Sequence, residues 1–225
     1  EDKNIFTIPG QHDLRFHTRE IVNTPLGVFC AAETLIILDE VVLSIGGTVR
    51  LFGFGWGSEI VNPDKTNETT IALIHKMVID DDKLWYGQKD FVMAKHLLRQ
   101  YPNIDLFVCG DNHKSFVVSE GNRHVVNCGS LMRANIDQTK HKPVVYIYDT
   151  EKKTLEQHFL KIKPAKQVFD LERAEERKEK DERLVAFVDG LEKMTTPDLQ
   201  FLHNLATAMK INKVTSGVKS IVEEA

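Results

Sequence analysis

Short apolar runs separated by glycine, proline and asparagine fill the chain up to about residue 163. Runs of this length that are rich in valine, isoleucine and phenylalanine are typical of β-strands. Gly46-Gly47 lies between two such runs and Glu120-Gly121-Asn122 between two others, so each predicts a hairpin. The predicted strands cover residues 4–8, 41–45, 48–54, 70–74, 104–109, 116–118, 124–127, 144–148 and 155–162, and residues 33–38 fit either a strand or a short helix.

Residues 88–101 show a helical spacing instead. Their apolar positions fall three or four residues apart, at Phe91, Ala94, Leu97, Leu98 and Tyr101. Proline at position 102 then ends the segment. Strands interleaved with a helix predict a layered α/β domain over residues 1–163.

The composition changes at Pro164. The segment DLERAEERKEKDER, residues 170–183, carries both charge signs and is typical of a solvated helix face. Two apolar stripes follow with helical spacing, one at Leu184, Phe187, Val188 and Leu191 and one at Val214, Val218, Ile221 and Val222. Residues 164–225 are therefore predicted to form a helical tail. Its stripes pack on the main domain, on each other or on a partner, and packing within the chain is the favoured interpretation.

The bulk composition excludes several classes of protein. A chain of 225 residues with a net charge of −4 has no global basic field that would attract nucleic acid, although this leaves a local basic face open. No apolar run reaches the ~18 residues of a membrane span, and the first residues show no signal-peptide pattern. Cys30, Cys109 and Cys128 form no CxxC pair, which favours buried reduced thiols and a cytoplasmic protein.

Three loops that follow predicted strands carry side chains of the kind that bind metals. They are residues 9–13 with Gln11 and His12, residues 74–75 with His75, and residues 110–113 with Asp111 and His113. In layered α/β folds, sites gather where loops leave the carboxyl ends of strands. A single histidine after a strand is usually a hydrogen-bonded structural residue, but three such loops in one chain indicate a Mn, Fe, Zn or Mg site.

These loops resemble the motifs of a known superfamily. GQHD, residues 10–13, is similar to the Gly-Asn-His-Asp/Glu loop of the calcineurin-like metallophosphoesterases, IHKMVID to their isolated-histidine motif, and GDNH to their Gly-His-x-His loop. NCGSLMR, residues 127–133, resembles the Pro-Gly-Ser-x-x-Arg element that follows in SbcD-type DNA-repair nuclease subunits. The resemblance covers roughly residues 4–163 and implies a layered β-sandwich flanked by helices.

The resemblance also implies a role for each matched residue. Gln11, His75 and Asp111 stand where the superfamily has ligands to its second metal, His113 where it has a ligand to the first, and His12 where a histidine assists the leaving group. The implied cofactors are two divalent metal ions. Two matches depart from the pattern, because Gln11 is longer than asparagine and Asp111 replaces a neutral imidazole with an anion. The anion favours Mn or Mg over softer ions, Fe and Zn stay open, and loss of the second metal is the competing outcome.

The first two motifs of the superfamily are absent from this chain. An Asp-x-His and a Gly-Asp, whose aspartate bridges both metals, should precede GQHD. Only ten residues precede Gln11, and they contain neither motif. We therefore expect the chain to lack amino-terminal strands and to hold only part of a two-metal site.

The resulting expectation is metal-dependent phosphodiester hydrolysis by a DNA exonuclease or endonuclease of the SbcD type. Two metals about 3.5–4 Å apart clamp the attacking and leaving oxygens in such a reaction. Arg133 either holds a phosphate or is a surface salt-bridge residue. The expected partners are DNA and, through the helical tail, an ATPase subunit or a second copy of the chain, with no membrane. The alternatives are a phosphatase or phosphodiesterase for small molecules and a non-catalytic binding scaffold of the same fold.

Overall fold

The computed structural model describes residues 4–18, 20–80, 89–133, 136–171, 173, 180, 183, 185–187 and 201–218. The chain divides into two compact units, Glu1–Lys163 and Pro164–Ala225. Within the described ranges, no helix has both the length and the apolar character needed to cross a membrane.

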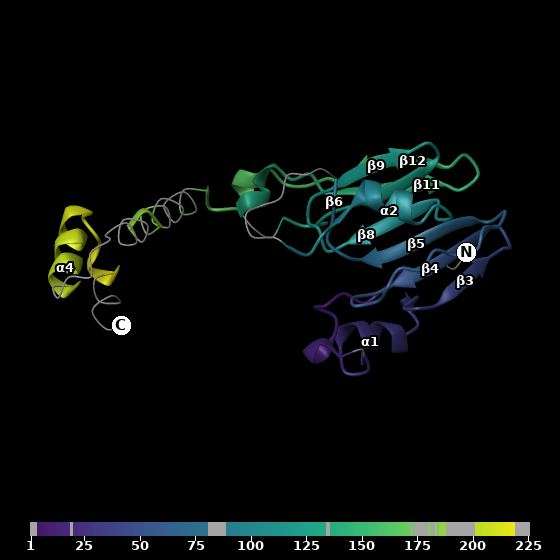
Figure 1. The fold of residues 1–225 in the computed structure, drawn as a ribbon, viewed down its shortest axis with the longest axis horizontal. Helices are drawn as coiled ribbons and strands as arrows, with labels where there is room; N and C mark the ends of the chain where they lie inside the picture. Colours follow the sequence, from purple (N-terminus) through teal and green to yellow (C-terminus); the bar gives the residue numbers. More distant parts are fainter. Residues whose placement is uncertain are drawn as a thin grey trace. The chain divides into compact units, whose positions relative to one another are not determined.

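A six-stranded mixed sheet forms the centre of the first unit (Figure 1). Its strands, in spatial order, are β3 (Val42–Ile45), β4 (Val49–Phe54), β5 (Thr69–His75), β8 (Leu106–Gly110), β10 (Arg123–Asn127) and β9 (Phe116–Glu120). The four inner strands run parallel, and each edge strand pairs antiparallel with its neighbour. The carboxyl ends of the inner strands therefore meet at one edge of the sheet.

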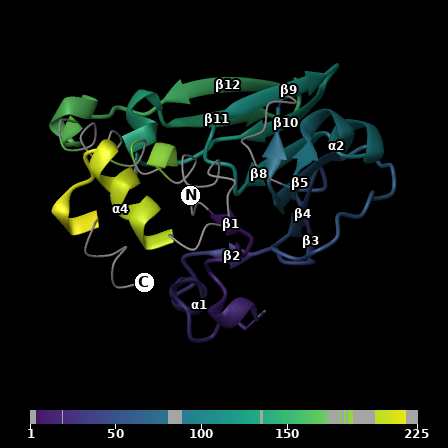
Figure 2. The ribbon, with the colours of Figure 1, turned by 60° about the vertical axis from the view of Figure 1, so that its left-hand side comes forward.

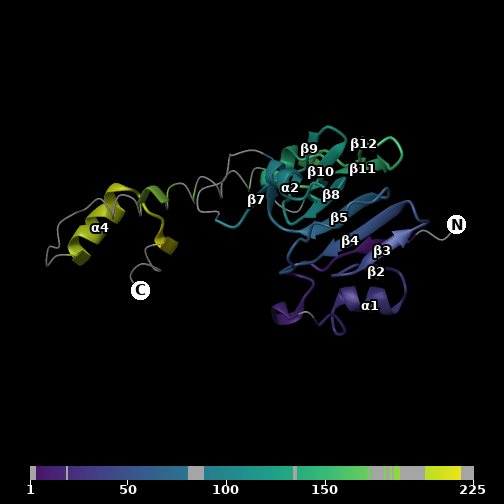
Figure 3. The ribbon, with the colours of Figure 1, turned by 45° about the vertical axis from the view of Figure 1, so that its right-hand side comes forward.

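Most positions of the inner strands are apolar and none is exposed, as expected for strands with both faces covered. Ala72 and Ile74 of β5 and Phe107 of β8 are completely buried. Helix α2 (Ala94–Gln100) covers one face and adds Leu97 and Leu98 to the same core. Figures 1 and 3 show α2 over the half of the sheet that contains β8 and β10, and α1 (Pro25–Ala31) beyond the β3 edge.

Three small two-stranded sheets surround the central one. In them, β1 (Phe6–Thr7) pairs with β2 (Ile36–Ile37), β6 (Val78–Ile79) with β7 (Val92–Met93), and β11 (Val144–Asp149) with β12 (Thr154–Phe159). Short 3-10 turns occupy Arg15–His17 and Ile136–Lys140. The hairpin of β11 and β12 lies beside β9 and β10 in every view (Figures 1, 2 and 3). Its turn is tied to β10, where the His124 ring contacts the Lys153 carbonyl oxygen at 2.8 Å.

The mixed α/β architecture expected from the sequence is confirmed, with two local differences. The helix predicted over residues 88–101 begins only at Ala94, because Val92–Met93 pairs with β6 as a strand, and residue 88 lies outside the described residues. Helix α1 was not predicted. Its start has a recognisable signal, since Thr24 Oγ1 accepts from the Gly27 amide at 3.2 Å and Pro25 occupies the first turn.

The tail has a small core of its own. Helix α4 (Phe201–Ile211) contributes Leu205, Ala208 and Met209, which pack with Phe187 and Val214. The last two residues belong to the two apolar stripes predicted from the sequence, so the stripes pack on each other at this point. The remaining stripe positions are Leu184, Val188, Leu191, Ile221 and Val222, which lie outside the described residues, and Val218, which is half-buried.

Deleting residues 164–225 should leave the first unit folded. The core of that unit is built from residues before Pro164, and the buried cluster of the tail is built from tail residues alone. We expect the thermal midpoint, measured by circular dichroism, to stay within about 4 °C of the parent value, the shift that ~1 kcal/mol produces at this size. Loss of the cooperative transition would show instead that the tail stabilises the first unit.

Candidate active site

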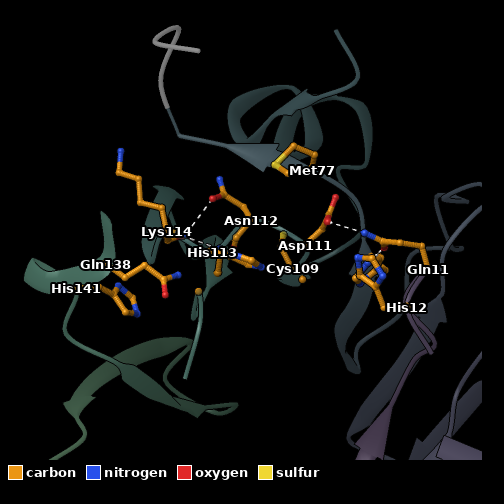
Figure 4. Close-up of a pocket in the computed structure, with 14 residues that line it drawn as sticks. Gln11, His12, Met77, Cys109, Asp111, Asn112, His113, Lys114, Gln138 and His141 are labelled. Carbon is orange, nitrogen blue, oxygen red and sulfur yellow. Dashed lines mark hydrogen bonds between the residues drawn. The ribbon is translucent and has the colours of Figure 1, made fainter. Parts of the chain in front are cut away.

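Polar side chains gather at the carboxyl edge of the central sheet. His75 is the last residue of β5 and pairs with Gly110, the last residue of β8. A cavity of about 790 Å³ opens at this edge, and Figure 4 shows the residues on its wall. All five residues that the sequence predicts as catalytic or metal-binding line this cavity, namely Gln11, His12, His75, Asp111 and His113.

Gln11 joins the three predicted loops to one another. Its Nε2 donates to Asp111 Oδ1 at 3.1 Å, and its Oε1 accepts from Nε2 of His75. The dashed line between Gln11 and Asp111 in Figure 4 marks the first of these contacts. An amide, an imidazole and a carboxylate from three separate segments are therefore in direct contact.

The His75 ring is held in the neutral form. Burial lowers its pKa below the ordinary value of 6.5, and this effect outweighs the nearby Asp111 carboxylate, which acts in the opposite direction. A neutral imidazole is the form that binds a metal ion. His75 is therefore available as a ligand at neutral pH.

Two glycines make room for the same ring. A Cβ atom at Gly10 would lie 2.7 Å from His75 Cε1, and one at Gly110 would lie 3.1 Å from His75 Nδ1. The Gly10 amide also donates to Asp13 Oδ2 at 2.8 Å, which closes the turn that carries Gln11. Glycine at these positions thus allows the ring to pack against the backbone of two loops.

The loop after β8 is held in an uncommon conformation. Asp111 has a φ of 90°, a value that residues with a side chain rarely adopt. Asn112 fixes the turn, because its Nδ2 donates to the Val78 carbonyl at 2.7 Å and its Oδ1 accepts from the Lys114 amide at 2.9 Å. Such backbone strain concentrates at functional sites, where the surrounding contacts maintain it.

Asn127 is a site residue to which the sequence assigned no role, although the element NCGSLMR begins with it. It ends β10, its side chain is 1% exposed, and it lines the cavity. Its Nδ2 donates to the carbonyl oxygens of Asn112 and Lys114, each at 2.7 Å. Because these two carbonyls flank His113, Asn127 fixes the loop that presents this histidine. The available signal was an amide directly after two valines at the end of a predicted strand.

Replacing Asn127 with alanine should destabilise the protein by about 2 kcal/mol, since it leaves two carbonyl oxygens without their donor. Urea denaturation of both proteins measures the difference. The matched control is Asn67→Ala, at an exposed position, which should change the stability by less than about 0.5 kcal/mol. Equal effects of the two substitutions would contradict the assigned role of Asn127.

The other histidines occupy different parts of the cavity. Figure 4 places His12 next to Gln11, and His113 nearer to Asn112 and Cys109. His141 also lines the cavity, and its Nε2 donates to the Ser130 carbonyl at 2.6 Å. No role was predicted for His141, because no motif surrounds it and only the folded chain brings it to this wall.

Arg133 does not belong to the cavity wall. Its guanidinium donates to the carbonyl oxygen of Thr139 at 3.4 Å and to that of Lys163. These contacts tie its own segment to the end of the first unit. The phosphate contact of Arg133 stays a prediction, and in this structure its guanidinium is bound to backbone carbonyls.

The ligand set for a metal is partial. Among the described residues, no group of three or more His, Cys, Asp or Glu side chains lies close enough to hold a metal ion. The contacting set has two such residues, His75 and Asp111, and adds the Gln11 amide. Cys109 lines the same cavity, but burial raises the pKa of its thiol well above the usual range and keeps it protonated.

Comparisons with known proteins give weak matches. The sequence matches no protein-family model and no curated protein. One similar solved structure is TT1561 of Thermus thermophilus, with 15% identity, a TM-score of 0.40, and coverage of 69% of this chain and 72% of that one. A second has 13% identity, a TM-score of 0.44, and coverage of 69% of this chain and 65% of its own. Neither likeness assigns a family to the chain.

Proposed function

We propose that the first unit is the hydrolytic part of a metal-dependent phosphodiesterase that acts on DNA. The observation that carries the proposal is the direct contact of Gln11, His75 and Asp111, which come from three separate segments. They meet in a cavity that His12 and His113 also line. A mixed set of nitrogen and oxygen donors at the carboxyl edge of a parallel sheet is suited to hydrolytic chemistry.

In this proposal, Gln11, His75 and Asp111 hold one divalent ion and His113 contributes to a second. Such ions lower the pKa of a bound water and stabilise the charge that develops on phosphate oxygens. The carboxylate and amide oxygens favour Mn, or Mg, as the ion. To hold two ions, these four residues require further carboxylate or imidazole ligands, as the resemblance to metallophosphoesterases implies.

The residues of the chain then have separate tasks. His75 stays neutral. Its Nε2 contacts Gln11 Oε1, and these two atoms would hold a metal ion with the imidazole in the tautomer that carries its proton on Nδ1. Asp111 supplies the negative charge that retains the ion. His12 is exposed on the cavity wall, where its ring can give a proton to the leaving oxygen.

DNA is the proposed substrate because NCGSLMR resembles the corresponding element of SbcD-type nuclease subunits. The helical tail supports the same assignment by analogy, as a segment for DNA, an ATPase partner subunit or a second copy of the chain. Arg133 is left out of the mechanism because its guanidinium is bound to backbone carbonyls.

A non-catalytic binding scaffold is the second candidate. Two observations favour it, since the described ligand set is partial and Gln11, His75 and Asp111 satisfy one another by hydrogen bonds. The two candidates differ in one measurement. Mn-dependent hydrolysis of bis(4-nitrophenyl) phosphate and of single-stranded DNA supports the enzyme, whereas a folded, Mn-loaded protein without turnover supports the scaffold.

A further inference from the structure

A second cavity, of about 400 Å³, adjoins the candidate active site. His75, Met77 and Asp111 line both cavities, and Figure 4 shows Met77 and Asp111 on the wall of the first. The second cavity is also lined by the aromatic residues Trp56 and Phe91. Its volume falls within the range of about 300–1,000 Å³ that is usual for sites of small ligands.

The fold fixes Trp56 beside the metal-binding loops. Trp56 follows β4 and so lies at the same sheet edge as His75, which ends the neighbouring strand β5. Its amide donates to the Pro9 carbonyl at 2.8 Å, in the segment that leads to Gln11. The next residue, Gly57, has a φ of 81°, which turns the chain after the tryptophan. The indole is therefore presented by a defined turn.

Phe91 reaches the same cavity through the small sheet of β6 and β7. The Val92 amide donates to the Met77 carbonyl at 2.9 Å, so Phe91 lies next to the segment that follows His75. Trp56 is 38% exposed and Phe91 is 36% exposed. Single exposed aromatic side chains are common on protein surfaces, but these two face one concave site from different segments.

Charged residues complete the wall. Lys76 and Lys89 supply two ammonium groups, which attract phosphate. Asp90 supplies a carboxylate, which accepts hydrogen bonds from the N–H groups of a base. Aromatic faces with cations beside them are the combination that binds single-stranded nucleic acid, since bases stack on the rings and the cations follow the backbone.

We infer that this cavity binds the nucleotide next to the scissile phosphate, with its base stacked on Trp56 or Phe91 and its outer phosphate near Lys76 and Lys89. The inference rests on the proposed function, because it takes the scissile phosphate to lie at His75 and Asp111. It assigns the substrate class as single-stranded DNA or DNA ends rather than phosphodiesters without a base.

The test compares equilibrium binding of deoxyadenosine 5′-monophosphate and 2-deoxyribose 5-phosphate by calorimetry in the presence of Mn. The parent protein should bind the nucleotide about tenfold more tightly than the sugar phosphate, from base stacking. Trp56→Ala or Phe91→Ala, whichever removes the ring that carries the base, should abolish this difference, and both variants should keep the parental affinity for the sugar phosphate. Trp56→Phe keeps an aromatic ring and should retain most of the preference for the nucleotide. This variant therefore distinguishes a loss of stacking from a folding defect. Phe159→Ala, at an exposed aromatic residue of β12, is the matched control and should bind like the parent.

Three results overturn the inference. They are equal binding of the two ligands by the parent, parental nucleotide binding by both Trp56→Ala and Phe91→Ala, and an equal loss of affinity for 2-deoxyribose 5-phosphate in the variant that binds the nucleotide less tightly. Hydrolysis of bis(4-nitrophenyl) phosphate by the parent is measured separately. Mn-dependent turnover with any of these three results refutes the base-binding site alone, whereas absence of turnover refutes the proposed function.

Discussion

Replacing His12 with alanine should lower Mn-dependent turnover of a phosphodiester with a poor leaving group by roughly 10²–10⁴, with bound metal unchanged. His12 is exposed on the cavity wall and adjoins Gln11, whose amide contacts His75 and Asp111. The two neighbouring residues therefore have different roles, because Gln11 faces the proposed metal ligands and His12 faces the cavity. A group that acts on the leaving oxygen stabilises the transition state and contributes little to metal binding.

A comparison of substrates with poor and good leaving groups distinguishes protonation of the leaving oxygen by His12 from a general loss of activity. Phosphodiesters with good leaving groups need little protonation, so His12→Ala should affect their turnover much less. His96→Ala is the matched control, at an exposed position on α2 that does not line the cavity, and it should behave like the parent. Near-parental turnover of His12→Ala on the poor-leaving-group substrate, with metal in place, would remove His12 from the mechanism.

Replacing His75 with alanine should lower the number of Mn ions that the protein binds by one. The contacts of His75 with Gln11, and of Gln11 with Asp111, bring the three proposed ligands of one ion together. Loss of the imidazole leaves an amide and one carboxylate, a donor set too weak to retain a Mn ion in competition with water. Metal analysis after desalting gives the number of bound ions, and His96→Ala again provides the control.

Asp111→Asn tests the charge at the same site without changing its shape. The asparagine Oδ1 still accepts from Gln11 Nε2, so the loop keeps its hydrogen bond while the anion is lost. Mn affinity should therefore fall without a loss of thermal stability. Because burial lowers the pKa of His75, protons compete with the metal at a lower pH than they would at an exposed histidine. A folded parent protein that binds no Mn under Mn-replete conditions would contradict the two-metal proposal and favour the scaffold.

The central strands and the loops that follow them were predictable from residue patterns alone. The runs at residues 70–74 and 104–109 became β5 and β8, because strands buried on both faces need continuous apolar residues. The structure pairs β5 with β8 in parallel, which brings His75 and Asp111 to one edge of the sheet. The apolar stripes likewise indicated a helical tail that packs within the chain, and the contact of Phe187 and Val214 with one cluster shows where the two stripes meet.

The local sequence pattern did not predict the structure where another segment of the chain determines the conformation. Residues 92–93 fit the helical spacing of residues 88–101, but they form β7 because β6 is available to pair with them. Arg133 has the charge to bind a phosphate, yet backbone carbonyls of its own unit hold its guanidinium. In both cases the deciding partner lies in another segment of the chain, and periodicity or residue type contains no information about it.

The packing of separate segments determined which donors meet and what surrounds them. Gln11 and Asp111 are 100 residues apart in the chain but 3.1 Å apart at their hydrogen-bonding atoms. Asn127 and Trp56 gain their roles from neighbours that no local motif specifies. Sequence patterns encode which faces are buried, because burial repeats with the period of each element. Contacts between side chains depend instead on how those elements come together, so the composition of the site followed from the folded chain.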